Sequence, residues 1–160
     1  MKYQMREQMF AIGDDYWVVT ESGERAFKVD GKALRIRKTL VLETPGGAEV
    51  YTIQKKLLSI RDTMEIERGG EAVATVSKAL ITPFRERYSI AFDGGSELDA
   101  KGNIVDHEYT IERRGDTVAQ ISKRWFSLRD TYGIEIADAQ DDALIVAITV
   151  CIDQMSHNTG

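Results

Sequence analysis

The chain has 160 residues and a formal net charge of -5, with 29% charged residues, which is typical of one globular domain spanning residues 1–160. The acidic balance argues against broad, charge-driven binding to nucleic acid or to an anionic membrane, although it allows a local basic patch. The single cysteine, Cys151, cannot form an intrachain disulfide, and the first nine residues lack the long apolar core of a signal peptide. These features predict a cytoplasmic protein.

Most of the chain, from about residue 4 to residue 137, consists of short segments in which apolar and polar residues alternate. Such alternation is typical of β-strands with one buried face. The segments expected to form strands are 9–12, 16–20, 25–30, 34–43, 49–54, 60–67, 72–77, 86–92, 96–100, 107–113, 117–123 and 132–137. Glycine pairs such as Gly69-Gly70 mark hairpin turns between neighbours. About twelve strands at this spacing predict a mainly β protein, either a closed antiparallel barrel or a sandwich.

The end of the chain has a different pattern. The segment Ala143–Ile152 carries no charge, and acidic residues precede it at Asp138, Asp141 and Asp142. Acids at that place favour the first turn of a helix, which predicts a hydrophobic helix over about 139–155. Most residues of the segment are β-branched, which favours a strand, so the pattern alone leaves a helix and a buried strand open. The segment is too short to cross a bilayer, which needs roughly 20 apolar residues.

The size of a twelve-stranded barrel favours the helix. About eight strands make a barrel that its own side chains fill, whereas twelve leave a wider interior that something else has to fill. A helix that is apolar on every side suits such an interior. A helix from Asp141 to Met155 would span roughly 22 Å at about 1.5 Å per residue. A strand of six residues spans roughly 20 Å, so the two lengths match.

One stretch of the chain occurs twice. Residues 54–66 and 122–134 share Arg-Asp-Thr at the same position, together with one lysine and one serine. We interpret the repeat as a recurring pair of strands joined by a basic and aromatic corner. A duplicated ligand-facing loop is the alternative.

Four motifs resemble a known family. They are the element Phe27–Lys32, the hairpin pattern that ends in Ser122–Trp125, the strand Tyr132–Ile136, and the apolar C-terminal segment followed by Asp153. Through the order and spacing of these short motifs, nearly the whole chain resembles the LURP-one-related family, which is similar to the tubby C-terminal domain and the phospholipid scramblases. The resemblance implies a twelve-stranded antiparallel β-barrel closed around a hydrophobic C-terminal α-helix. It implies no activity, because most bacterial members have none established.

Residue types that carry catalysis are sparse. His107 is expected at the surface end of a strand, and no second histidine or cysteine accompanies it at a spacing that holds a metal. Cys151 lies within the apolar segment, where a thiol is buried and inert. No glycine-rich segment has the spacing of a phosphate-binding loop. We therefore expect no catalytic residue, no metal site and no cofactor.

Basic residues are concentrated at the two copies of the repeat. A possible site for an anion or a lipid headgroup comprises six cations: Lys55, Lys56, Arg61, Lys123, Arg124 and Arg129. Further charge comes from Arg35, Arg37 and Lys38. The alternative is that these cations lie on solvated strand faces. Trp125 and Phe126, beside the second copy, are expected in the barrel core.

The sequence thus predicts a non-enzymatic binding module that engages an anionic membrane lipid or a protein partner through one rim. Such a protein would lie in the cytoplasm or at the membrane periphery, without a nucleic-acid partner or a transmembrane segment. A scramblase-like, lipid-handling role is one alternative, which the short apolar segment disfavours. An enzyme with an unmarked pocket is another.

Overall fold

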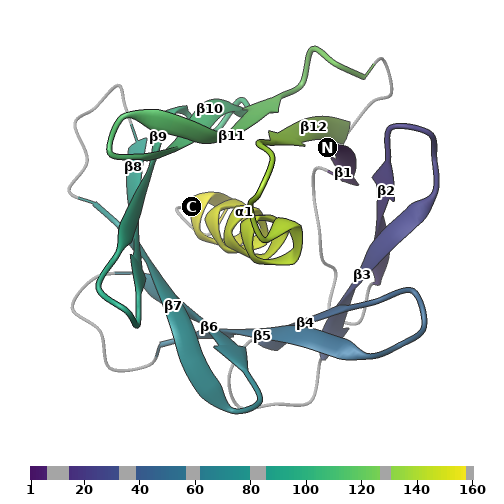
Figure 1. Cartoon of the computed structure of the whole chain (residues 1–160), viewed down its shortest axis with the longest axis horizontal. Helices are drawn as coiled ribbons and strands as arrows, with labels where there is room; N and C mark the ends of the chain where they lie inside the picture. The colour runs from purple at the N-terminus through teal and green to yellow at the C-terminus, as the bar shows by residue number, and fades with distance from the viewer. Residues whose placement is uncertain (7–14, 33–38, 57–61, 80–85, 127–130, 158–160) are drawn as a thin grey trace.

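The computed structural model describes residues 1–6, 15–32, 39–56, 62–79, 86–126 and 131–157. Within these residues, twelve strands form one sheet that closes on itself (Figure 1). Their bounds are β1 (Lys2–Arg6), β2 (Tyr16–Thr20), β3 (Arg25–Lys32), β4 (Thr39–Glu43), β5 (Glu49–Lys55), β6 (Thr63–Arg68), β7 (Glu71–Lys78), β8 (Glu86–Phe92), β9 (Glu97–Asn103), β10 (Glu108–Arg113), β11 (Asp116–Ser122) and β12 (Thr131–Ile136).

The strands follow one another around the barrel in chain order. Each strand pairs antiparallel with its neighbours, and β1 pairs with β12 to close the sheet, with Tyr3 opposite Ile134. The Met1 amino group donates a hydrogen bond to the Ile136 carbonyl over 3.0 Å. The predicted fold class, a closed antiparallel barrel, is confirmed. The first strand differs from the prediction, because β1 precedes the expected strand 9–12, which lies outside the described residues.

The alternating strand directions give the barrel two distinct ends. We call the end that holds the turns after even-numbered strands the hairpin rim; its tight turns include those between Thr20 and Arg25 and between Arg113 and Asp116. The opposite end, the far rim, holds the connections after odd-numbered strands. Of these connections, the structure describes the whole of the one between Asn103 and Glu108.

The remaining element, α1 (Asp142–His157), lies inside the barrel and runs from the hairpin rim toward the far rim (Figure 1). Every residue from Val146 to Ile152 is 0% exposed. Inward strand residues such as Tyr88 and Ile90 belong to the same core, while the residues between them face solvent. The part of the chain that the structure describes contains no helix with the length and apolarity that a bilayer crossing requires.

A closed sheet explains why this β-branched segment is helical. A strand needs a neighbouring edge to satisfy its backbone N–H and C=O groups, and a closed barrel has no free edge. A helix satisfies those groups internally, so it is the form in which a buried segment avoids the cost of unpaired backbone groups. The Thr149 hydroxyl donates to the Ile145 carbonyl over 2.9 Å and needs no other partner.

The start of α1 is set by Asp141. Its carbonyl accepts from the Ile145 amide over 3.0 Å, and its Oδ1 accepts from the Leu144 amide over 3.1 Å, which makes Asp141 the N-cap. The helix therefore starts at Asp142, three residues later than the expected bound of 139. Ala139 has a φ of 63°, a left-handed conformation that does not belong to a right-handed helix.

Candidate functional site

Inside the barrel, one buried carboxylate collects several polar groups. Asp153, near the end of α1, is 4% exposed, and its Oδ1 lies 3.2 Å from Nε2 of His107. Its Oδ2 accepts a hydrogen bond from the Tyr132 hydroxyl of β12. The His107 and Tyr132 rings are stacked, with centroids 4.2 Å apart and an angle of 24° between planes. The three side chains thus join the helix to two parts of the barrel wall.

The prediction for His107 was wrong. The side chain was expected at the surface, but it is 1% exposed and faces the interior from the turn between β9 and β10. His107 has a left-handed backbone conformation, with a φ of 53°, at which the chain turns sharply. Its amide donates to the Ile104 carbonyl over 3.1 Å. Asn103 and Asp106 brace the turn through a hydrogen bond of 2.7 Å between their side chains. The left-handed turn makes the burial possible.

Tyrosines surround the same carboxylate. Tyr16 of β2, Tyr109 of β10 and Tyr132 are buried. Burial raises the pKa of each hydroxyl well above its usual value, and the Asp153 charge adds to the shift. Burial also raises the pKa of Tyr88 on β8, and the negative charge of Glu86 adds to this shift. The four hydroxyls therefore stay protonated beside the carboxylate.

A second set of tyrosine contacts fixes the other end of α1 at the hairpin rim. The Tyr3 hydroxyl donates to Asp142 Oδ2 over 2.5 Å, and the Tyr51 hydroxyl donates to Asp141 Oδ2 over 2.7 Å. Arg68 of β6 donates to the Tyr51 hydroxyl over 2.7 Å and lies 3.8 Å from the Asp141 carboxylate. The helix is therefore held to the wall by carboxylate contacts at both ends.

All six tyrosines of the chain are buried. Tyr3, Tyr51 and Tyr132 bond to carboxylates of α1 or of its N-cap, and the charge of Asp153 acts on the other three. The sequence interpretation missed this set. A signal was present, because each tyrosine stands close to the first residue of its strand, in the inward register. The contact partners could not be read from the sequence, because they are carboxylates on a distant helix.

The buried polar groups around Asp153 connect α1 to the barrel wall. His107, Tyr132 and Asp153 all lie below 5% exposure, so a substrate would have to displace part of the wall or of α1 to reach them. Within the described residues, no group of three or more His, Cys, Asp or Glu side chains is arranged to hold a metal ion. Cys151 is buried, as the sequence predicted, and burial raises the pKa of its thiol.

The predicted basic site divides between two walls. Lys55 ends β5 and Lys123 follows β11, and these strands are six positions apart in a ring of twelve, so both residues lie at the far rim on opposite sides of the barrel. The other predicted cations, Arg61 and Arg129 with Arg35, Arg37 and Lys38, lie outside the described residues.

Carboxylates accompany the described cations. Lys55 lies 4.0 Å from Asp62, and Lys56 lies 3.8 Å from Glu65. On the other wall, Arg124 lies 3.9 Å from Glu108 with 87% of its side chain exposed. Pairs this long and this exposed to water contribute little to stability, so the charges remain accessible to a solvent-borne partner.

The prediction that Trp125 and Phe126 belong to the barrel core was wrong. Both side chains lie on the outer surface of the barrel. Both are partly buried, and a Cβ added to Gly133 would come within 2.6 Å of Trp125 and 2.8 Å of Phe126. Gly133 has the outward register of β12, because its neighbours Tyr132 and Ile134 belong to the core. The missing side chain of Gly133 makes room for the two rings.

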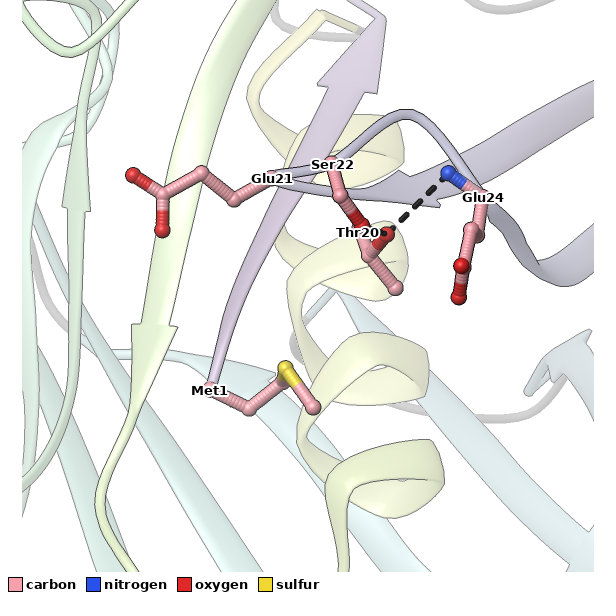
Figure 2. Close-up of a pocket in the computed structure, with 5 residues that line it drawn as sticks. All are labelled: Met1, Thr20, Glu21, Ser22 and Glu24. Atoms are coloured by element: carbon pink, nitrogen blue, oxygen red, sulfur yellow. Dashed lines mark hydrogen bonds between the residues drawn. The ribbon is translucent and has the colours of Figure 1, made fainter.

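A hollow of about 420 Å³ lies at the hairpin rim, at the opposite end from the basic residues. Figure 2 shows Met1 on one side of it and Thr20, Glu21, Ser22 and Glu24 on the other. The Thr20 hydroxyl accepts from the Glu24 amide over 3.1 Å, which orders the turn (Figure 2). Among the described residues, the side chains that line this hollow include two carboxylates, those of Glu21 and Glu24.

A closed twelve-stranded antiparallel barrel around a buried C-terminal helix defines the class of protein. The model of the LURP-one-related family matches residues 1–153, so the chain belongs to that family, and the resemblance found in the sequence is confirmed. The chain is also similar to "Uncharacterized protein YxjI" of Bacillus subtilis (strain 168), with 25% identity over 154 residues that cover 96% of this chain and 93% of that protein. Neither comparison names an activity or a ligand.

Proposed function

We propose that this protein is a non-catalytic, cytoplasmic binding module that engages an anionic lipid headgroup through the corner Lys123–Phe126. We call these four residues the basic-aromatic corner. The observation that carries the proposal is the pairing of an exposed cation, Arg124, with two aromatic rings seated on the outer wall. Cations with adjacent aromatic side chains suit the boundary between headgroups and water.

The interior of the barrel is already filled, which favours a binding site at its rim. Helix α1 occupies the bore, and its apolar residues from Ile145 to Ile152 are buried. A ligand that leaves this packing intact has to bind from outside. The far rim is therefore the better place for a headgroup than the bore.

The backbone of the basic-aromatic corner is held by Glu108 of β10. Its Oε1 accepts from the Ser122 hydroxyl and from the Lys123 amide, each over 3.0 Å. The Arg124 amide donates to the Ser122 hydroxyl oxygen over 3.1 Å. These bonds hold the corner in place before any ligand arrives, which lowers the entropy cost of binding.

Flotation with vesicles tests the proposal. The full chain is mixed with phosphatidylcholine vesicles that contain or lack phosphatidylserine, at low and at physiological ionic strength. We expect flotation with the anionic vesicles that weakens as salt is added, because exposed charges are screened. Absence of flotation at low salt with either vesicle would refute the lipid proposal.

A matched pair of variants locates the surface. The double change Lys123→Gln and Arg124→Gln should weaken partitioning by roughly 30-fold, since each basic residue near an anionic surface contributes about 1 kcal/mol. Arg87→Gln with Lys101→Gln removes two exposed charges from directly paired positions on β8 and β9, away from the corner. If both double variants lose binding equally, the corner is not the site.

A further inference from the structure

A second hollow, of about 270 Å³, lies at the hairpin rim between the start of α1 and the wall. One side comes from the hairpin between β8 and β9, including Phe92 and Ser96. The other comes from the segment that enters the helix, including Gln140 and Leu144, and Arg113 at the end of β10 completes the lining.

The floor of this hollow is apolar. Phe92, Leu144 and Ile145 all contribute to its lining. Leu144 and Phe92 are only partly buried, whereas the helix residues from Val146 to Ile152 are 0% exposed. The hollow is thus the place where the apolar surface of α1 is incompletely covered by the barrel, and an apolar chain of a ligand would complete that cover.

One cation, Arg113, and one carboxylate, Asp141, line this hollow. Arg113 is exposed, and among the described residues none forms a recorded hydrogen bond or ion pair with its guanidinium. Asp141 also lines the hollow, but its oxygens already accept from the Leu144 amide and the Tyr51 hydroxyl, and Arg68 lies 3.8 Å away. Because Asp141 already has partners, the guanidinium of Arg113 is the charged group that is available to a ligand.

We infer that this hollow binds a small anion with a short apolar chain. The acidic head pairs with Arg113, for which a guanidinium offers two parallel N–H donors. The chain lies on Phe92 and Leu144, and the Ser96 hydroxyl and Gln140 amide provide further polar contacts at the mouth. The site is at the opposite end of the barrel from the basic-aromatic corner, so it stands independently of the proposed function.

Two probes of equal chain length test the inference. Sodium octanoate and octyl phosphate are titrated into the full chain while amide shifts are followed by two-dimensional NMR, with octyltrimethylammonium as the cationic counterpart. We expect shifts at Ser96, Arg113 and Leu144 with at least one of the anions, and the carboxylate and phosphate arms identify the preferred head. Absence of shifts with both anions, or equal shifts with the cation, would overturn the inference.

Variants separate charge from folding. Arg113→Gln should weaken anion binding by about fivefold, which is the upper end for an exposed ion pair. Arg114→Gln, the next residue along the same hairpin, is the matched control and should bind as the unmodified chain does. Leu144→Trp fills the hollow and should abolish binding while the remaining amide spectrum stays that of a folded barrel. Undiminished binding in Arg113→Gln would overturn the role of the guanidinium.

Discussion

The imidazole of His107 and the carboxylate of Asp153 lie 3.2 Å apart, although 46 positions separate them in the chain. One belongs to the turn between β9 and β10 and the other to the last turns of α1. The contact fixes the end of the helix against the wall at the far rim. Both groups are buried, so if one were removed, water could not take its place as a hydrogen-bond partner of the other.

Removal of the Asp153 carboxylate should be strongly destabilising. Asp153→Ala leaves the Tyr132 hydroxyl and a His107 ring nitrogen without their acceptor in the interior. Each buried polar group left without a partner costs about 1–3 kcal/mol, so we expect the two together to lower the free energy of unfolding by about 2–6 kcal/mol, measured by urea denaturation. Asp153→Asn keeps one acceptor oxygen and should lose less.

The control for that variant is Asp138→Ala, at an exposed carboxylate before the helix. Its free energy of unfolding should change by no more than about 0.5 kcal/mol. A loss at Asp153 as small as the loss at Asp138 would show that the buried contacts do not stabilise the fold.

The tyrosines predict the response to alkali. The pKa of all six hydroxyls is raised in the folded chain, by burial first and then by nearby carboxylates, and that of Tyr51 reaches about 12. The folded state therefore keeps protons that the unfolded chain releases near pH 10. Their stabilisation is complete below about pH 10 and is lost as the pH rises through the raised values.

An absorbance titration of phenolate checks this prediction. The native chain should show little phenolate near pH 10, followed by a steep rise that coincides with unfolding seen by circular dichroism. A subset of tyrosines that ionises near pH 10 in the folded protein would contradict the burial of all six.

A charge in the middle of α1 should prevent folding. Ile148 is 0% exposed, so Ile148→Asp buries a carboxylate in the apolar core. The conservative change Ile148→Val should fold and lose about 0.5–1.5 kcal/mol, measured by thermal or urea unfolding. An aspartate variant with an unchanged melting temperature would show that the helix does not lie in the core.

The N-cap offers a smaller effect. Asp141→Ala removes the acceptor for the Leu144 amide and for the Tyr51 hydroxyl. We expect a loss of about 0.5–2 kcal/mol from the cap alone, measured by urea denaturation. Asp141→Asn can still cap the helix, so it should retain most of the stability, and an equal loss in both variants would refute the capping role.

Gly133 should control the basic-aromatic corner. The Cβ of Gly133→Ala would come within 2.6 Å of Trp125 and 2.8 Å of Phe126, so the rings have to move outward. In a Trp17→Phe background, the emission of Trp125 should shift to longer wavelength while the far-ultraviolet circular dichroism stays unchanged. An unshifted emission would mean that the rings are not seated on Gly133.

The fold could be predicted because local patterns add up to it. Alternation within short segments gives the strands, and the uncharged segment Ala143–Ile152 suits only an enclosed position. The exact first residue of α1 could not be predicted, because it depends on the backbone conformation of individual residues such as Ala139, which is left-handed.

The interior contacts could not be predicted in the same way. His107 stands at a strand end among polar neighbours, which is the pattern of a surface residue, and only the left-handed turn carries it inward. Trp125 and Phe126 follow the end of β11, where strand alternation no longer assigns a face. The separation of Lys55 from Lys123 was available in principle, since six sequential strands make half of a twelve-stranded ring.

Hydrogen exchange at the backbone amides of Val146–Ile152 tests most directly whether α1 fills the barrel. Because every one of these residues is 0% exposed inside a closed sheet, their amides should be among the slowest to exchange and should follow the global free energy of unfolding. Exchange of these amides well before those of the central strands would contradict a helix enclosed by the barrel.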